Sequence, residues 1–225
     1  MSKKIKFIVL EGNDGSGKST QFKLLKAKLE ESDEKVESIK FPQHGETFFG
    51  KMVDDYLNGE FGDATKVPAK LASAIYAADR WQAKDQLNKW LESGSIILAD
   101  RYMSANKGHQ LSKLESEEEK LAMLNWLDKM EYEVYGIPRP DLVIYFNMPI
   151  KFNLLNDREA GGKEYIDGEL DNHENDPEYL GKTNEAFLFT AKHYEYWKVI
   201  DCVKDNKRLP PDEIHELVWK VLKKN

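Results

Sequence analysis

Short apolar runs alternate with longer amphipathic stretches along most of the chain. The run at residues 5–10 is mostly apolar and ends in a glycine-rich turn, which predicts a buried β-strand. Similar runs predict strands at residues 36–41, 96–99, 142–146 and about 198–202. Helical spacing of apolar residues predicts helices at residues 19–29, 47–57, 68–94, 115–135, about 178–196 and 211–223. This alternation predicts a three-layer α/β fold, with a parallel sheet of about five strands flanked by helices.

The whole chain, residues 1–225, is predicted to form a single domain, because it has no internal repeat and is long enough to bury a core. Residues 157–178 differ from the rest: they are acidic, rich in glycine and without periodicity, which predicts a mobile lid. In the helix predicted at residues 68–94, we expect the apolar side chains of Leu71, Ile75 and Ala78 to face the core.

Charge and cysteine content narrow the class of protein. The net charge of −7 gives no broad electrostatic footprint for a nucleic acid polymer, but a small phosphorylated ligand needs only a local cationic site. The single cysteine, Cys202, cannot form an intrachain disulfide, which favours a reducing, cytoplasmic location. The apolar run at residues 7–10 is too short for a signal peptide or a membrane span.

A phosphate-binding motif follows the first predicted strand. Residues 12–19 match the P-loop pattern G-x-x-x-x-G-K-[ST], with a strand before it and a helix after it. In such a loop, backbone N–H groups surround a phosphate, Lys18 reaches the transferred phosphate, and the Ser19 hydroxyl binds Mg²⁺. The expected phosphate-binding residues are Gly12, Asn13, Asp14, Gly15, Ser16, Gly17, Lys18, Ser19 and Thr20. The fold is thus predicted to be a P-loop fold.

Other polar residues are candidates for binding a second substrate. Asp14 either accepts a hydrogen bond from a sugar hydroxyl or bonds its own backbone as a turn residue. Asp100 and Arg101 follow a predicted strand at the end where α/β sheets bind ligands. They hold Mg²⁺ and clamp a phosphate, respectively, or they form a structural salt bridge.

A third set of candidates points to recognition of a base. Tyr76 and Arg80 share a helix face, so they either stack and bond a base or belong to a solvated surface. Gln110, after His109, is a candidate to read a base edge.

In combination these features resemble the thymidylate kinase family over essentially the whole chain. The shared features are the P-loop with Asp14, Phe41-Pro42, Tyr76 with Arg80, Asp100-Arg101-Tyr102, His109-Gln110 and Pro138-Arg139-Pro140-Asp141. The resemblance implies phosphoryl transfer from Mg-ATP to dTMP, giving ADP and dTDP, by a protein that forms homodimers. It also implies that Tyr76 stacks on thymine, Arg80 bonds its edge, Asp14 contacts the 3′-hydroxyl, and Arg101 contacts the phosphates of both substrates. Phe41, His44, His109 and Gln110 complete the implied dTMP site.

The chain departs from the family pattern at four places. His44 stands where family members usually carry an arginine for the acceptor phosphate, and His109 stands where an aromatic residue crowds out a 2′-hydroxyl. Gly15 leaves the P-loop without an arginine, and the stretch Leu170-Asp171-Asn172-His173-Glu174 leaves the usual lid position without one. We therefore expect Arg158 to close over the phosphates, with Lys163 as the weaker candidate because it lacks a bidentate fork.

Two other functions stay open at this point. The same chemistry could act on a different monophosphate or on a deoxynucleoside. The missing lid arginine also allows a nucleotide-binding protein without turnover.

Overall fold

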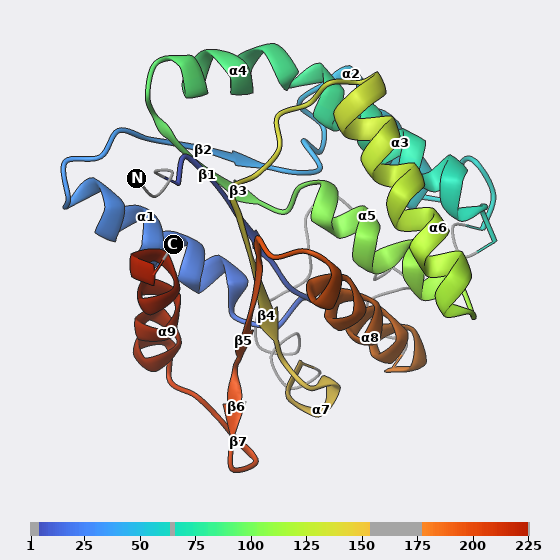
Figure 1. Cartoon of the computed structure of the whole chain (residues 1–225). Helices are drawn as coiled ribbons and strands as arrows, with labels where there is room; N and C mark the ends of the chain where they lie inside the picture. Colours follow the sequence, from blue (N-terminus) through green and yellow to red (C-terminus); the bar gives the residue numbers. More distant parts are fainter. Residues whose placement is uncertain (1–4, 64–65, 154–176, 225) are drawn as a thin grey trace.

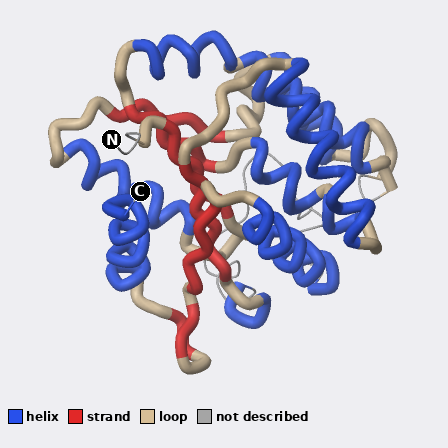
Figure 2. The backbone as a smooth tube through the Cα atoms, viewed as in Figure 1, coloured by secondary structure: helices blue, strands red, loops and turns tan. Residues whose placement is uncertain are grey.

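The structure is a computed structural model, which describes residues 5–63, 66–153 and 177–224. At its centre lies a five-stranded parallel sheet in the order β2-β3-β1-β4-β5, with helices on both faces (Figures 1 and 2). The strands are β1 (Phe7–Glu11), β2 (Val36–Lys40), β3 (Ile96–Asp100), β4 (Leu142–Asn147) and β5 (Trp197–Asp201). The predicted three-layer α/β fold is confirmed.

Each face of the sheet buries its own apolar core, because successive strand residues point to opposite faces. Phe7 and Val9 of β1 belong to one core, and Ile8 and Leu10 belong to the other. Helices α1 (Lys18–Glu30) and α9 (Pro211–Lys224) lie together over the second core, whereas α4 (Lys84–Glu92), α5 (Met103–His109) and α8 (Pro177–His193) cover the first (Figure 1).

The remaining helices surround α5. Helices α3 (Ala69–Gln82) and α6 (Glu117–Asp128) pack on α5, and α2 (Phe48–Leu57) packs on α3. The short elements are the 3₁₀ turn η1 (Leu111–Lys113), the π-helical segment η2 (Lys129–Val134), α7 (Ile150–Asn153), and the hairpin strands β6 (Val203–Lys204) and β7 (Lys207–Arg208). The periodicity did not predict α5 or the hairpin, and it assigned the residues of η2 to an ordinary α-helix.

The predicted helix at residues 68–94 is two helices, which meet at Ala83. The prediction of which face of this helix points toward the core was also wrong. The Leu71 side chain is 62% exposed, whereas Arg80 is only 2% exposed. Arg80 can be buried because a buried carboxylate, Glu131, binds it, as described below. A face that looked polar in the sequence is therefore an interior face.

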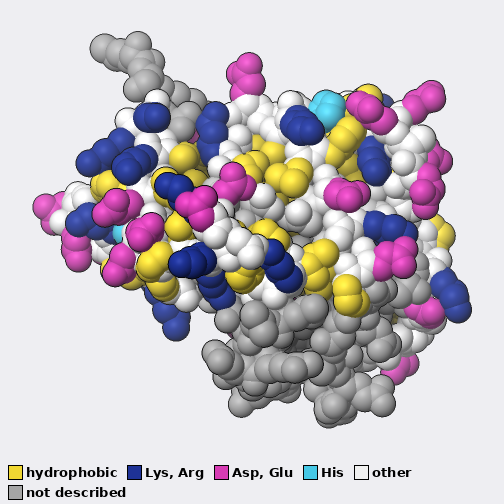
Figure 3. Space-filling view, turned by 90° about the horizontal axis from the view of Figure 1, so that it is seen from below, with side chains coloured by type: hydrophobic (Ala, Val, Ile, Leu, Met, Phe, Trp, Pro, Cys, Tyr) yellow, Lys and Arg dark blue, Asp and Glu magenta, His cyan; other side chains and the backbone are white. Residues whose placement is uncertain are grey.

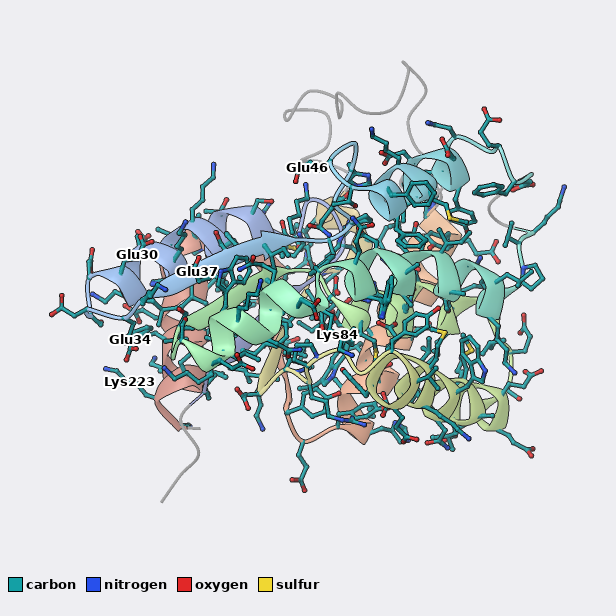
Figure 4. The ribbon with its side chains drawn as sticks, turned by 90° about the horizontal axis from the view of Figure 1, so that it is seen from above. Glu30, Glu34, Glu37, Glu46, Lys84 and Lys223 are labelled. Carbon is teal, nitrogen blue, oxygen red and sulfur yellow. The ribbon has the colours of Figure 1, made fainter. Side chains whose placement is uncertain are left out.

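The long helix predicted at residues 115–135 is likewise two segments, α6 and η2. A capping box between Ser116 and Glu119 starts α6, and the widened π-helical turns of η2 end it. Lys84, labelled in Figure 4, donates from Nζ to the Tyr135 carbonyl at 2.9 Å, so the start of α4 is tied to the end of η2.

The predicted lid at residues 157–178, with Arg158 and Lys163, falls almost entirely outside the described residues, which resume at Pro177. Within the described part of the chain, no helix combines the length and the apolar character that crossing a membrane requires.

A buried lysine lies between α5 and the end of α6. The Lys107 side chain is fully buried, its Nζ lies 2.7 Å from Asp128 Oδ1, and the ammonium sits 3.4 Å from the centroid of the Tyr194 ring. Burial lowers the pKa of Lys107 from 10.5 to about 8, although Asp128 opposes the shift. Folding therefore favours the neutral form of Lys107 over its ammonium form.

This burial predicts a specific pH dependence of stability. Between pH 8 and pH 10.5 the unfolded chain binds more protons at Lys107 than the folded chain does, so this group's contribution to the free energy of unfolding rises with pH. Urea unfolding should be measured for the wild type and for Lys107→Met. Across this pH window, the free energy of unfolding of the wild type should rise relative to that of the variant by at most about 3 kcal/mol. A difference that stays constant with pH would contradict the lowered pKa.

Candidate active site

The loop between β1 and α1 has the backbone geometry of a phosphate cradle. Gly15 and Gly17 have φ angles of 74° and 89°, which side chains other than glycine rarely adopt. A Cβ on Gly12 would lie 2.7 Å from Ser16 Oγ, so this position also needs glycine. Helix α1 starts at Lys18, and its N-terminal N–H groups face the loop. The loop predicted from the motif thus has a glycine-dependent backbone that leads into a helix N-terminus, an arrangement that suits phosphate binding.

Lys18 pairs with the first residue of the Asp100-Arg101 sequence. Asp100 ends β3 opposite Leu10 of β1, and its Oδ1 atom contacts the Lys18 ammonium directly. Both side chains are largely buried. Burial lowers the pKa of Lys18, and the nearby Arg101 guanidinium lowers it further, whereas Asp100 raises it. The strand register thus sets a cation and a carboxylate side by side at the mouth of the loop.

Arg101 adopts a backbone conformation that is rare for its type. Its φ is 65°, and its N–H donates to the Leu10 carbonyl at 3.0 Å. Arg101 Nη2 donates to Asp14 Oδ1 at 2.8 Å, and Nε lies 3.8 Å from Glu11 Oε1. Asp14 and Asp100 therefore pair with different cations, and Arg101 does not form the structural salt bridge with Asp100 that was the alternative.

Glu11 is a carboxylate that the sequence reasoning missed. It ends β1, is fully buried, and accepts hydrogen bonds from the Gly12 N–H at 3.0 Å and from Ser104 Oγ at 2.7 Å. Burial raises its pKa, although Arg101 lowers it. It lies behind Arg101, where it orients the guanidinium toward the P-loop.

A second polar cluster surrounds Arg80. Arg80 Nε and Nη2 each donate to the Glu131 carboxylate at 2.6 Å, which is a bidentate pair. Asn106 Nδ2 donates to the same carboxylate at 3.0 Å and to the Ser73 carbonyl at 3.1 Å. Burial alone would lower the pKa of Arg80, but the Glu131 carboxylate raises it. Arg80 is thus a fixed, charged group from α3, held by η2 and α5.

The other predicted base-site residues lie on elements around this cluster. The Tyr76 ring meets Tyr56 edge to face at 5.8 Å between centroids. Phe41 packs against Tyr102, with 5.5 Å between centroids. Tyr102 directly follows Arg101 and so joins the two polar clusters.

The three remaining predicted residues have different surroundings. His44 Nδ1 contacts Asp54 Oδ1 of α2, so this carboxylate orients the imidazole. His109 Nδ1 lies 2.9 Å from the Tyr179 hydroxyl. Gln110 is buried, and its Oε1 has no hydrogen-bond partner among the described residues. An amide oxygen in that state accepts a hydrogen bond from a ligand at little cost.

Comparison with known proteins identifies the family. Residues 10–209 match the sequence profile described as Thymidylate kinase. The chain belongs to the thymidylate kinase family. A probable thymidylate kinase from Thermococcus kodakarensis is 31% identical over 88% of this chain and 90% of its own length. The thymidylate kinase of Mycobacterium tuberculosis is 25% identical over 91% of this chain and 98% of its own. The thymidylate kinase structure from Candida albicans superposes with a TM-score of 0.74 at 23% identity, covering 100% of this chain and 94% of that one, and so supports the fold.

In this member of the thymidylate kinase family, sequence reasoning missed three site residues, and two of them, Glu131 and Asn106, had no detectable signal in the sequence. Glu131 lies 51 residues from Arg80, and Asn106 lies 25 residues from Glu131. Glu11 directly precedes the P-loop, so its place at the end of a buried strand could have indicated a role.

The Arg80–Glu131 pair makes a prediction about stability. Glu131→Gln should lower the free energy of unfolding by about 3–5 kcal/mol, because it leaves the Arg80 charge buried without its partner. The matched control is Glu133→Gln, which alters an exposed carboxylate of the same segment. Urea unfolding measures both.

A double change separates this explanation from a packing effect. Arg80→Met combined with Glu131→Met removes both charges and should recover much of the stability that Glu131→Gln loses. If the double variant is no more stable than Glu131→Gln, the loss does not come from the unpaired charge.

Proposed function

We propose that the protein transfers the terminal phosphoryl group of ATP to dTMP, giving ADP and dTDP. The observation that carries the proposal is the connection between the two polar clusters. Arg101 joins the P-loop through Asp14, and the adjacent Tyr102 lies within electrostatic range of the fixed Arg80 guanidinium. A phosphate-transfer site and a base-reading cation are therefore neighbours. The names of the relatives, which are thymidylate kinases, point to the same reaction.

The chemistry requires charge neutralisation more than proton transfer. An oxygen of the acceptor phosphate is already ionised near neutral pH. It bonds to the γ-phosphorus of ATP as the bond from that phosphorus to the β–γ bridging oxygen breaks, and ADP leaves. Two anions must approach one another, so the barrier falls when cations surround the transferred group. We assign this role to Lys18 and Arg101. The two side chains lie close enough that the charge of Arg101 lowers the pKa of Lys18. Arg158, which we propose as a third cation, lies outside the described residues.

The residues that would hold Mg²⁺ suit that ion. Ser19 offers a hydroxyl in the first turn of α1, and Asp100 offers a carboxylate, both hard oxygen ligands. Mg²⁺ commonly takes only one or two protein ligands and completes its shell with phosphates and water. When bound, it would screen charge on the β- and γ-phosphates. Lys18 would then exchange its contact with Asp100 for a phosphate, and Asp100 would turn to the metal.

We propose that the acceptor site consists of the residues that the family resemblance implied. Tyr76 stacks on thymine, and Arg80 and Gln110 bond its edge. Gln110 Oε1, a buried acceptor without a described partner, supports a donor on the base. Asp14 contacts the 3′-hydroxyl, Phe41 belongs to the same site, and His44 and Arg101 take the phosphate. His109 stays our prediction for the group that discriminates against a 2′-hydroxyl.

Nucleic acid is not a proposed partner. On the face shown in Figure 3, Lys and Arg side chains are interspersed with Asp and Glu side chains. A duplex or single strand would need a continuous cationic track. A cytoplasmic location remains an expectation, based on the single cysteine.

The substrate assignment is tested with a panel of acceptors. With Mg-ATP, dTMP should give the highest kcat/KM among dTMP, dUMP, dCMP, dAMP and thymidine in a coupled assay of ADP release. Thymidine should not react, since it lacks the acceptor phosphate. A preference for another monophosphate would replace dTMP in the proposal. Binding of ATP without ADP release on any acceptor would favour a nucleotide-binding protein without turnover.

The P-loop variant serves as the control for this assay. Lys18→Ala should lower kcat with dTMP by about a thousandfold or more, on the scale of removing a charge partner of the transition state. Near-native turnover would contradict the assignment of residues 12–19 as the catalytic P-loop.

We also propose a homodimer formed through helices. An apolar surface joins α2, α3 and η2 through the side chains of Phe48, Phe49, Trp81, Val134 and Tyr135. Its rings form a continuous row, with centroid separations of 5.2, 6.3 and 6.4 Å from Phe48 to Tyr135. Phe48 is 75%, Val134 69% and Trp81 48% exposed. A contiguous apolar surface of this kind is typical of a protein interface.

Charge placed on this surface should dissociate the dimer. Trp81→Lys combined with Val134→Lys should shift the mass measured by light scattering from that of two chains to that of one. Val199→Lys, which alters an exposed apolar residue of β5, is the matched control and should leave a dimer. A wild type that is already monomeric, or a double variant that stays dimeric, contradicts this interface.

A further inference from the structure

A cation from the end of the chain lies against the P-loop. Arg208, in the β6–β7 hairpin, donates from Nη2 to the Gly15 carbonyl at 3.2 Å, across 193 residues of sequence. A Cβ on Gly17 would lie 3.3 Å from the same nitrogen. The guanidinium therefore lies over the part of the loop that leads into α1.

The hairpin fixes Arg208 in this position. Arg208 pairs with Val203, and the two residues of the turn, Asp205 and Asn206, have φ angles of 50° and 58°, as a tight two-residue hairpin requires. Lys151 Nζ contacts Asn206 Oδ1, so α7 also holds the turn. The next residue along the chain, Leu209, packs in the core beneath α1 and α9. The backbone at Arg208 is therefore held in place before a ligand binds, which lowers the entropic cost of binding.

The sheet order places Arg208 on the side away from the acceptor site. Asp100 and Arg101 follow β3, which lies on one side of β1, whereas the hairpin follows β5, beyond β4 on the other side. In the proposed site, the acceptor phosphate approaches the γ-phosphate from the β3 side. In-line transfer places the leaving ADP on the opposite side of the γ-phosphorus from the acceptor. The α-phosphate and nucleoside of the donor therefore extend toward β4, β5 and the hairpin.

Arg208 has the donors that an α-phosphate needs. A guanidinium carries five N–H donors, and the described contact with Gly15 uses one of them. The side chain is only partly buried, so the others can reach a ligand. Its planar fork matches two phosphate oxygens.

We propose that Arg208 binds the α-phosphate of the donor nucleotide, while its contact with Gly15 holds the guanidinium at the edge of the cradle. This inference rests on the proposed use of ATP. Arg208 does not touch the transferred phosphoryl group, so it is a donor-binding residue rather than a catalytic one. Its loss should weaken the binding of ATP and ADP and leave the dTMP site unchanged.

The experiment compares Arg208→Ala, Arg208→Lys and the control Lys207→Ala, an exposed lysine of the same hairpin. Calorimetry gives Kd for Mg-ADP and for dTMP, and steady-state kinetics gives kcat and both KM values. Arg208→Ala should raise Kd for Mg-ADP and KM for ATP by about tenfold to a hundredfold, the range for a hydrogen bond to a charged group. Kd for dTMP should stay the same, kcat should fall less than threefold, and Lys207→Ala should match the wild type.

The lysine variant distinguishes ligand binding from support of the loop. Lysine keeps one donor for Gly15 but loses the fork, so Arg208→Lys should stay at least about fivefold weaker for Mg-ADP. Full recovery with lysine, equal losses for ADP and dTMP, or a fall in kcat with Kd for ADP unchanged would each overturn the proposal. A wild type that fails to bind Mg-ADP would instead overturn the proposed donor, whatever the variants do.

Discussion

The pairing register of β1 with β3 is the constraint on which the site depends. Leu10 lies opposite Asp100, so the residues that follow each strand emerge at the same edge of the sheet. From one strand come Glu11 and the P-loop, and from the other comes Arg101, whose N–H donates back to Leu10. A slip of one residue would exchange the two faces of β3 and move Asp100 away from Lys18. The two apolar cores, which lock alternate side chains of each strand to one face, therefore also fix the distances between the charges.

Buried ion pairs extend this order from the sheet to the helices. A buried charge is expensive, and its pair repays the cost only with good geometry and further hydrogen bonds. The Arg80–Glu131 pair has both, through its bidentate contact and Asn106. Such a pair specifies how α3, α5 and η2 meet, because any other arrangement would leave a charge unpaired. This specificity accounts for a polar interior between these helices, because a buried ion pair by itself adds little stability over an apolar core.

The sequence predicted what local pattern determines. The strands, the P-loop and the alternation of elements follow from short-range periodicity and from glycine, and the structure agrees with them. The split at Ala83 and the exposure of Leu71 could not be predicted, because both depend on what α3 packs against. Glu131 is the clearest case: its role exists only once Arg80, 51 residues away, lies beside it. Pairing of side chains between distant elements produces no periodic pattern in the sequence. Burial of one face of a strand or helix does produce such a pattern.

The proposed function requires an acidic chain to bind polyphosphates, and the distribution of charge in the site suits that requirement. With a net charge of −7, the protein repels anions at long range, but screening limits that repulsion to about 10 Å at ordinary salt. Within the site, Lys18 and Arg101 each lie against carboxylates, which hold them in place and keep the cluster near neutral. A metal–nucleotide complex carries both signs and can match each member of such pairs, with phosphates taking the cations and the metal taking a carboxylate. A polyanion without a metal could pair with the cations of the site but not with its carboxylates. Under the proposed function, the paired arrangement of this site favours a nucleotide bound together with its metal over free phosphate.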